Sequence, residues 1–297
     1  MGYFEKLIVV KLQGGLGNQM FQYATARALS DEPVCFDLSF LKYNNVSTDL
    51  LTARTFELGI FKSMHLLRIN PYLLRLVLNQ GKKYKFIKRL LPKSLMHVNV
   101  VSDVNITQYK EKRAYGVTIF QGDFQNPDFF LSIREKLLGE FTFPMIPDEL
   151  ANLKAQITGS NAVGIHIRRG DYLKPEFIKV HGVLGKDYYR NAILEISRRV
   201  ENPVFFIFSD DIEWCKKEMQ ITNFVPNFVS DKSVPAWVDL LLMSVCKHNV
   251  IANSTFSWWG AWLNKNPNKI VISPLNWSAN TTLNTGTKII PQDWIRL

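Results

Sequence analysis

The residues best suited to chemistry lie in the run 166–172 (HIRRGDY), directly after the apolar run 162–165, which reads as a buried strand. Arginine is rarely buried unless it is paired, and its fixed fork of donors matches the oxygens of a phosphate or a carboxylate. Ligands of open α/β sheets bind at the carboxyl ends of the strands, where Arg168 and Arg169 stand. The pattern predicts an anion site for a phosphorylated ligand. The alternative is a structural salt bridge from either arginine to Asp171.

Two aspartates, Asp210 and Asp211, follow a second apolar run at residues 204–208. Guanine presents two adjacent N–H donors on its pairing edge, and one carboxylate can accept both, so either aspartate is a candidate for reading that base. The alternative is N-capping of the helix expected to follow. A metal site fits less well, because the two carboxylates are adjacent and no histidine cluster accompanies them.

A third element, residues 251–262, places small polar side chains between an expected strand and an expected helix. Hydroxyl groups beside the exposed N–H groups of a helix start can bind phosphate, and they can equally serve as plain helix caps. The tryptophans of this run, which are Trp258, Trp259 and Trp262, are expected in the core, with stacking on a sugar as the lesser alternative.

Near the start of the chain, a glycine-rich turn at residues 13–19 joins an expected strand (7–12) to an expected helix (20–29). It lacks the G-x-G-x-x-G spacing of dinucleotide-binding turns and the lysine and hydroxyl pair of a P-loop. The glycines permit either close approach of a ligand to the backbone or simply a tight turn.

The arginine pair, the aspartates and the hydroxyl cluster all lie in the second half of the chain, after successive strands. Together they predict one site for a nucleotide diphosphate whose β-phosphate leaves during the reaction. Arginine can neutralise the charge that develops on the leaving group, which is the role a metal ion plays elsewhere.

Short apolar runs alternate with helical patterns along the chain, which predicts an α/β protein with parallel sheets. The runs outside the motifs are 34–36, 117–120, 249–252 and 269–272, and helical patterns cover 187–200 and 236–246. The proline-rich residues 143–147 and the polar residues 158–161 favour two domains, 1–150 and 151–297.

Composition indicates a folded protein, because 46% of the 297 residues are hydrophobic and 12% are aromatic. No apolar run reaches the roughly 18 residues needed to span a bilayer. The chain enters a strand at once, which leaves no room for a signal peptide. The three cysteines are isolated, so neither a metal site nor a disulfide framework is expected, and a reducing cytoplasm fits best.

The formal net charge of +10 is concentrated in residues 62–93, which hold nine Lys or Arg residues and no Asp or Glu. Apolar residues interleave with these charges in the manner of a basic amphipathic helix. Such a helix can lie on an anionic membrane, and the alternative is an ordinary helix with a solvated basic face. Nucleic acid is the weaker possibility and is not expected as a partner, because basic residues alone give a nonspecific signal.

With these motifs the chain resembles the bacterial α-1,2-fucosyltransferases. The resemblance rests on residues 13–23, 166–172 and 253–261, with support from 208–211 and 239–243. It implies a glycosyltransferase-B-like fold of two Rossmann-like domains facing a cleft, GDP-β-L-fucose as the donor, and no cofactor or metal. It also implies transfer of L-fucose, with inversion, to the 2-hydroxyl of a galactose in a glycan acceptor. The alternatives are another GDP-sugar transferase and a non-catalytic GDP-sugar-binding protein.

The resemblance also assigns roles to individual residues. Arg169 would contact the β-phosphate with support from Arg168, and His166 would face guanine together with Asp210 or Asp211. Further donor-binding residues would be Gly15, Gly17, Asn18, Asn253, Ser254, Thr255, Phe256 and Ser257. Acceptor-binding residues would be Gln19, Asp123 and Gln125, although the usual Gly-Tyr-Phe-Gln reads Gly-Asp-Phe-Gln at residues 122–125.

A general base would help by taking the proton of the acceptor hydroxyl. Glu176 and Asp171 are the candidates. Glu176 stands where core fucosyltransferases have a proposed base, and Asp171 can instead orient the arginines. A loose transition state would also allow the proton to pass to water or to phosphate.

Overall fold

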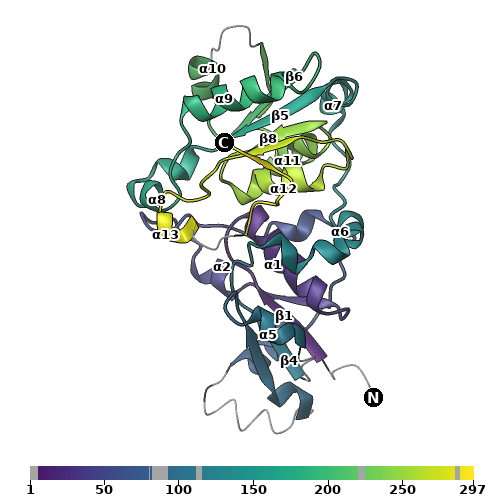
Figure 1. The fold of residues 1–297 in the computed structure, drawn as a ribbon. Coiled ribbons are helices and arrows are strands. Elements are labelled where there is room, and N and C mark those ends of the chain that lie inside the picture. The colour runs from purple at the N-terminus through teal and green to yellow at the C-terminus, as the bar shows by residue number, and fades with distance from the viewer. Residues whose placement is uncertain (1–5, 80, 82–92, 112–115, 220–224, 285–287) are drawn as a thin grey trace. The chain divides into compact units, whose positions relative to one another are not determined.

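The structure is a computed structural model, which describes residues 6–79, 81, 93–111, 116–219, 225–284 and 288–297 (Figure 1). The chain divides into two compact units. The first unit comprises Met1–Val46 and Ala53–Thr142, and the second comprises Ser47–Thr52 and Phe143–Leu297. The division thus falls eight residues before the expected position after residue 150, and the short segment Ser47–Thr52 belongs with the second unit.

The first unit is built on a four-stranded parallel sheet in the order β2-β1-β4-β3. Its strands are β1 (Lys6–Lys11), β2 (Val34–Asp37), β3 (Val98–Val101) and β4 (Gly116–Phe120). The glycine-rich turn connects β1 to helix α1 (Leu16–Leu29). Gly14 in that turn has a φ of +72°, a backbone conformation that favours glycine, so the tight-turn explanation is confirmed at this position.

The remaining described helices of the first unit are short. They are α2 (Ser39–Tyr43), η1 (Leu58–Ile60), α3 (Pro71–Leu78), η2 (Lys93–Met96), α5 (Ile106–Glu111), η3 (Pro127–Phe129), η4 (Leu131–Ile133) and α6 (Arg134–Glu140). A buried ion pair joins one of them to α1, because Arg27 Nε of α1 lies 3.0 Å from Glu140 Oε1 of α6. Tyr23 donates a 2.7 Å hydrogen bond to the other oxygen of the same carboxylate, so the polar groups of this pair are satisfied.

Helix α3 tests part of the amphipathic pattern at residues 62–93. Its Leu73, Leu74, Val77 and Leu78 pack on the core of the first unit, beside β1 and β4. The apolar side of this helix is therefore covered by protein, as expected for an ordinary helix with a solvated face. Residues 80 and 82–92, which carry most of the lysines of the basic segment, lie outside the described residues.

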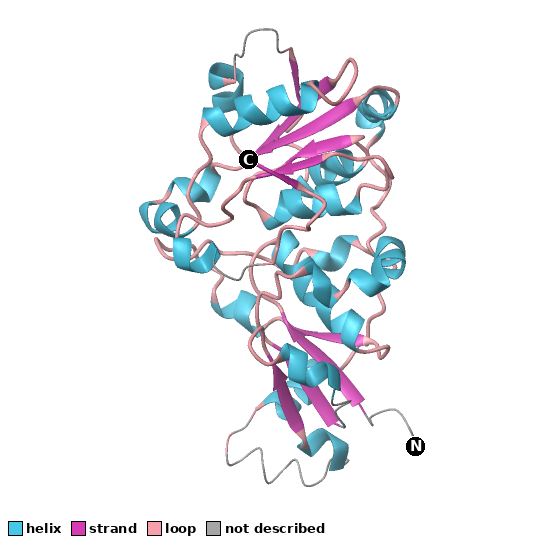
Figure 2. Cartoon of the chain, in the orientation of Figure 1, coloured by secondary structure: helices cyan, strands magenta, loops and turns pink. Residues whose placement is uncertain are grey.

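The second unit contains a six-stranded parallel sheet in the order β10-β9-β8-β5-β6-β7 (Figure 2). Its strands are β5 (Ala162–Ile167), β6 (Val204–Ser209), β7 (Pro226–Phe228), β8 (His248–Val250), β9 (Val271–Ser273) and β10 (Ile295–Arg296). All six residues of β5 are buried, as expected for a central strand covered on both faces. The two sheets confirm the α/β class with parallel strands.

The described helices of this unit are η5 (Asp148–Leu150), α7 (Ala151–Thr158), η6 (Gly170–Leu173), α8 (Pro175–Val180), α9 (Lys186–Ser197), α10 (Ile212–Glu218), α11 (Ala236–Ser244), α12 (Thr255–Leu263) and α13 (Thr281–Asn284). Of these, α9 and α12 cover opposite faces of the sheet. Among the described helices, none combines the length and the apolar character that crossing a bilayer requires.

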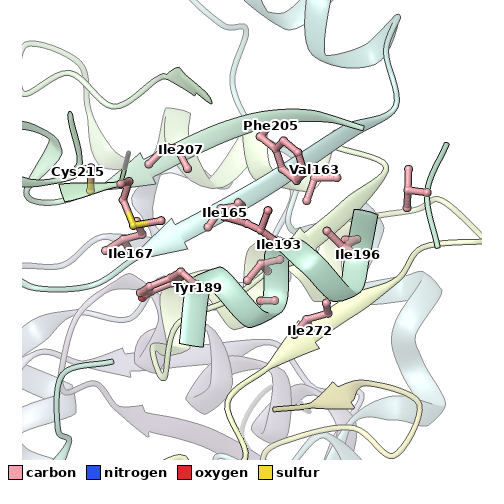
Figure 3. Close-up of a cluster of buried hydrophobic side chains, with 14 residues drawn as sticks. Val163, Ile165, Ile167, Tyr189, Ile193, Ile196, Phe205, Ile207, Cys215 and Ile272 are labelled. Atoms are coloured by element: carbon pink, nitrogen blue, oxygen red, sulfur yellow. The ribbon is translucent and has the colours of Figure 1, made fainter. Parts of the chain in front are cut away.

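Alternation along β5 sorts its side chains between these helices. Val163, Ile165 and Ile167 lie in a cluster with Tyr189 and Ile193 of α9 (Figure 3). The alternate side chain of His166 instead meets the ring of Phe256 in α12, with 5.6 Å between the ring centroids. One face of β5 is thus covered by α9, and the other faces α12.

The tryptophans of α12 belong to the core, as predicted. Trp258 and Trp259 are fully buried and Trp262 nearly so, and Trp258 Nε1 donates a 2.7 Å hydrogen bond to the carbonyl of Ile289. All three cysteines are free and buried, which agrees with their isolated positions in the sequence.

Candidate active site

The three motifs of the second half meet at the carboxyl edge of the second sheet. β5 pairs with β6 on one side and β8 on the other, with Ile167 opposite Ser209 and Ile165 opposite Val250. The residues that leave these three strands therefore emerge side by side. This confirms the prediction that the arginine pair, the aspartates and the hydroxyl cluster belong to one edge.

Arg168 lies between two carboxylates. Its Nη2 is 2.5 Å from Asp171 Oδ1 and its Nη1 is 2.8 Å from Asp210 Oδ2, so the salt bridge to Asp171 considered as an alternative is present. Burial alone would lower the pKa of Arg168, but the two aspartates outweigh it and raise the pKa above its usual value. The guanidinium also lies 5.2 Å from the ring centroid of Tyr172. Its buried Nε has no hydrogen-bond partner among the described residues.

Arg169 takes the opposite side of β5. Its guanidinium lies 3.8 Å from the ring centroid of Trp214 in α10, and its Nε lies 3.2 Å from Asp211 Oδ2. The two arginines therefore diverge. Arg168 turns to the face that His166 and α12 share, and Arg169 turns to the face of α9 and α10, as the alternation of β5 continued past its last residue would place them.

Asp210 and Asp211 are engaged by these arginines. Besides Arg168, Asp210 accepts the backbone N–H of Arg169 at 2.9 Å. Asp211 is the N-cap of α10 and accepts the N–H of Trp214 at 3.3 Å, which confirms the capping alternative for this residue. The geometry therefore does not favour the predicted guanine contact for either carboxylate, because both already hold cations and N–H groups.

A fourth carboxylate at this edge is Asp239 of α11, to which the sequence analysis assigned no role although residues 239–243 supported the resemblance. It accepts a 2.5 Å hydrogen bond from Ser230 Oγ, and Ser230 Oγ in turn accepts the N–H of Ser209 at 2.8 Å, where β6 ends. Burial raises the pKa of Asp239 to about 6. An acidic residue inside the apolar helix 236–244 was the signal in the sequence that could have identified it.

His166 is buried, and its Nδ1 has no hydrogen-bond partner among the described residues. Burial, and secondarily Arg168, lower the pKa of His166 to about 3, so the imidazole is neutral near pH 7. A neutral imidazole with an unused ring nitrogen can exchange one hydrogen bond with a ligand. This arrangement suits the predicted position of His166 beside the guanine base of the donor.

The hydroxyl cluster separates into two kinds of residue. Ser254 is the N-cap of α12, and its hydroxyl makes no capping hydrogen bond, while Thr255 is the first residue of the helix. Ser257 is fully buried, and its Oγ lies 3.1 Å from the carbonyl of Ser254 and 3.3 Å from that of Ala252. Ser254 and Thr255 can thus reach a phosphate at the helix N-terminus, whereas the predicted phosphate contact of Ser257 does not fit its position.

Asn253 also has a different role from the one predicted. Its Nδ2 donates to the carbonyl of His181 at 2.7 Å and lies 3.3 Å from that of Trp277. The amide group is buried, and its nitrogen is bonded to main-chain carbonyls of the protein. A direct donor contact through this nitrogen does not fit the structure.

The two candidate bases differ in their surroundings. Asp171 is the partner of Arg168, which fits the orienting role considered for it. Glu176 lies on α8 in a half-exposed ion pair with Lys179, at 2.6 Å. Both carboxylates thus hold cations.

The candidate residues of the first unit gather where β1 and β4 end. Gln13 Nε2 donates to Asp123 Oδ1 at 3.0 Å, and Gln125 Nε2 lies 3.4 Å from Asn18 Oδ1. The glycine-rich turn, which contains Gly15 and Gly17, therefore adjoins residues 122–125.

Gln19 is an exception among these residues. It is fully buried, its Nε2 donates to the carbonyls of Gly14 and Thr55, and its Oε1 accepts the N–H of Glu57. The predicted acceptor contact does not fit an amide that is enclosed and engaged in this way. Gln19 instead ties residues 55–57 to the glycine-rich turn.

Within the part of the chain that the structure describes, no group of three or more His, Cys, Asp or Glu side chains is arranged to hold a metal ion. The cations at the edge of the second sheet are the two arginines.

Comparison with solved structures finds similarity to fucosyltransferases. The NodZ α-1,6-fucosyltransferase soaked with GDP-fucose gives a TM-score of 0.47 at 11% identity and covers 87% of this chain and 92% of its own. Arabidopsis thaliana FUT1 in complex with GDP gives a TM-score of 0.49 at 13% identity and covers 93% of this chain and 72% of its own.

Comparison with protein sequences is more decisive. The chain is 36% identical to an α-1,2-colitosyltransferase of Escherichia coli, over 98% of this chain and 99% of that protein. It is also 36% identical to the O-antigen biosynthesis glycosyltransferase WbnK of Escherichia coli, over 96% and 99%. A family model described as glycosyl transferase family 11 matches residues 82–297. The chain therefore belongs to glycosyl transferase family 11, the family of the α-1,2-fucosyltransferases.

Proposed function

We propose that this glycosyltransferase transfers L-fucose from GDP-β-L-fucose to the 2-hydroxyl of a galactose, with inversion at the anomeric carbon. The observation that carries the proposal is the position of Arg168 and the start of α12 on the same side of β5. A guanidinium and a helix N-terminus together can hold a diphosphate and stabilise the charge that grows on it as it leaves.

Arg168 is the better candidate for the β-phosphate, although sequence matching favours Arg169. Tyr172, whose ring lies beside Arg168, donates its hydroxyl to the carbonyl of Asn253 at 3.1 Å, and Asn253 directly precedes Ser254. Arg168 is thus linked to the start of α12, while Arg169 is held on the other side by Asp211 and Trp214. The Nε of Arg168, which has no hydrogen-bond partner among the described residues, gives it a donor to offer.

The guanine base would be read by His166 and Asp239. Asp171, Asp210 and Asp211 are paired with arginines, whereas Asp239 is a partly buried carboxylate that accepts a hydrogen bond from Ser230 Oγ. One carboxylate can accept both N–H donors of guanine.

In the transfer step, the bond between C1 of fucose and the β-phosphate oxygen breaks, and its electron pair stays on GDP. The galactose 2-hydroxyl oxygen forms the new bond to C1 from the opposite face and loses its proton. Glu176 is proposed to accept this proton as the general base. Asp171 serves instead as the partner that orients Arg168. Asp123 and Gln125 of the first unit are proposed to contact the acceptor.

The direct test is to incubate the purified protein with GDP-fucose and lactose and to determine the product linkage by NMR. An α-1,2-linked fucosyl-galactose is expected, with release of GDP. Formation of a different linkage, or no transfer to any galactoside although GDP-fucose binds, would contradict the proposal.

A second donor is favoured by one observation, namely the colitosyltransferase relative. Colitose is L-fucose without its 3-hydroxyl group. A site built to hydrogen-bond that hydroxyl rejects the deoxy sugar strongly, whereas a site that only encloses the ring does not. Comparing kcat/KM for GDP-fucose and GDP-colitose decides between the two, and a clear preference for GDP-colitose would replace fucose in the proposal.

We also propose that transfer needs no metal ion, because arginine supplies the positive charge at the leaving phosphate. Activity should then persist in excess EDTA. Loss of activity on chelation that is restored by Mn²⁺ or Mg²⁺ would contradict this.

The basic segment 62–93 leads to a proposal about location, at the cytoplasmic face of a membrane that holds the acceptor. Because α3 packs on protein, attraction to anionic lipid would come from the remaining charges, at roughly 1 kcal/mol for each basic side chain near the surface. Glutamine in place of Lys82, Lys83, Lys85, Lys88 and Arg89 should weaken sedimentation with anionic liposomes and spare transfer to lactose. A parent protein that does not sediment at low salt would exclude membrane contact.

A further inference from the structure

Both ends of the loop 172–181 are held by one residue, Asn253. At the start of the loop, the Tyr172 hydroxyl donates to the backbone carbonyl of Asn253 at 3.1 Å. At its end, Asn253 Nδ2 donates to the carbonyl of His181 at 2.7 Å. The rings of Tyr172 and His181 stack with 4.7 Å between their centroids and 14° between their planes. The loop is therefore closed upon itself at Asn253.

A second segment supports the same end of the loop. Ser278 Oγ donates to the carbonyl of Val180, and the N–H of Ala279 donates to that carbonyl at 3.0 Å. Asn253 Nδ2 also lies 3.3 Å from the carbonyl of Trp277, so its amide bridges the loop and this segment. Such a bridge needs a donor, because two carbonyl oxygens face it. An aspartate at the same position would bring a third acceptor to the site.

The loop carries groups that matter to the proposed chemistry. Tyr172 begins it and lies beside Arg168, and the preceding residue Asp171 is the ion-pair partner of that arginine. Helix α8 with Glu176 forms its middle. Lys174 in addition donates to the carbonyl of Thr48 at 3.1 Å, within the segment that the second unit takes from the first half of the chain. A change in the position of this loop would therefore move the surroundings of Arg168.

We propose that Asn253 is a positioning residue, which closes the loop 172–181 and thereby holds Tyr172 and Asp171 against Arg168. The inference deepens the proposed function and rests on it for its effect on transfer. It replaces a direct contact of the Asn253 amide with the donor, because that amide is buried and bonded to main-chain carbonyls. The side chain would act on the reaction only through the loop.

The test is hydrogen–deuterium exchange of the ligand-free protein, comparing the parent with Asn253→Ala and Asn253→Asp. Removing the buried donor takes one hydrogen bond from the carbonyls of His181 and Trp277, although the carbonyl of His181 keeps the N–H of Ala279 at 3.2 Å. This loss should speed exchange of the α8 amides by about tenfold or more. Asn253→Asp should be at least as severe as Asn253→Ala, since the carboxylate repels the same carbonyls. Unchanged exchange in α8 in both variants would overturn the proposal.

Two further variants keep the result interpretable. Asn264→Ala removes another buried amide of the second unit, one that donates to Asn249 Oδ1 at 2.8 Å, and it should leave α8 exchange at the parent rate. Tyr172→Phe keeps the ring and removes only the hydroxyl, so it should give a smaller acceleration in a folded protein even if the Asn253 variants do not fold. Equal acceleration of α8 exchange by Asn264→Ala would show general destabilisation and would refute a specific role of Asn253.

Calorimetry with GDP and initial rates with GDP-fucose complete the test. A positioning role predicts a lower kcat with the Kd for GDP within about threefold of the parent value, since lost transition-state positioning lowers kcat. A large rise in the Kd for GDP with unchanged α8 exchange would show a direct ligand contact instead. Exchange is measured without substrate, so a failure of fucosyl transfer in the parent would count against the proposed function and not against the loop closure.

Discussion

The two sides of β5 differ in what they offer a ligand. On the face covered by α9 and α10, Arg169 lies on the indole ring of Trp214 and is paired with Asp211, which also caps α10. On the face of α12, Arg168 is paired with Asp171 and Asp210, and its Nε has no hydrogen-bond partner among the described residues. Arg168 is also linked through Tyr172 and Asn253 to the start of α12. From this difference we propose that the adjacent arginines have unequal functions, with Arg168 binding the ligand and Arg169 supporting the fold of the site.

The largest effect should come from Arg168→Ala. Losing a charged donor that faces the leaving phosphate should lower kcat/KM by about a hundredfold to a thousandfold. Arg168→Lys should restore little, because an ammonium group cannot bridge Asp171 and Asp210 as the guanidinium does. Steady-state kinetics with GDP-fucose measure this, with circular dichroism to verify the fold. Near-parent activity in both variants would remove Arg168 from the mechanism.

Arg169→Ala sharpens the comparison, because its effect should be clearly smaller. The variant loses the contact with Trp214 and the ion pair with Asp211, which together predict a decrease in kcat/KM of about tenfold. Trp214→Leu should reproduce part of that decrease. If Arg169→Ala is instead the more damaging of the two arginine variants, the ranking by sequence matching was right and the structural ranking is wrong.

Asp239 predicts a pH dependence of both binding and stability. Its pKa is raised to about 6, so the folded protein binds this proton more tightly than the unfolded chain, and the stability contribution of this group falls as pH rises from about 4 through 6. Asp239→Asn should flatten that part of the stability curve. The parent affinity for GDP should increase as the pH rises through 6, because only the ionised carboxylate accepts both guanine N–H groups. Calorimetry from pH 5 to 7 checks this, and an affinity independent of pH would exclude Asp239 from the base site.

The smallest effect separates two serines of the hydroxyl cluster. Ser254→Ala should weaken GDP binding by about threefold to tenfold, as expected for one hydrogen bond to a charged phosphate. Ser257→Ala should leave the Kd for GDP unchanged, because the Ser257 hydroxyl bonds to the main-chain carbonyls of Ala252 and Ser254, just before α12. Calorimetry on the matched pair tests the assignment, and equal weakening in both variants would contradict it.

Much of the fold and the location of the site follow from local sequence. The strand runs, the intervening helices and the glycine turn were predictable because parallel strands are apolar and end in polar motifs. Even the divergence of the arginines follows from the alternation of β5, since residues 166 and 168 share one face and 167 and 169 the other. Sequence matching alone obscured this and ranked Arg169 first.

The remaining site residues depend on tertiary contacts that local sequence does not show. Ser257 and Gln19 have side chains suited to a ligand, but both are buried in the fold and their polar groups form hydrogen bonds with main-chain groups. The side chain of Asn253 donates its hydrogen bond to the carbonyl of His181, which lies 72 residues earlier in the chain at the end of a loop. Asp239 lies in an apolar helix, and its hydrogen-bond partner Ser230 lies just after β7, so their contact depends on the position of that strand in the sheet. No periodicity indicates such long-range hydrogen bonds.

The central claim, that Arg168 and not Arg169 holds the leaving phosphate, is tested most directly by a crystal structure with bound GDP. The account predicts the β-phosphate within hydrogen-bond distance of Arg168 and of the N–H groups at the start of α12, beside Ser254 and Thr255. It also predicts Arg169 still stacked on Trp214. A β-phosphate bound by Arg169, with Arg168 making no contact with the ligand, would contradict it.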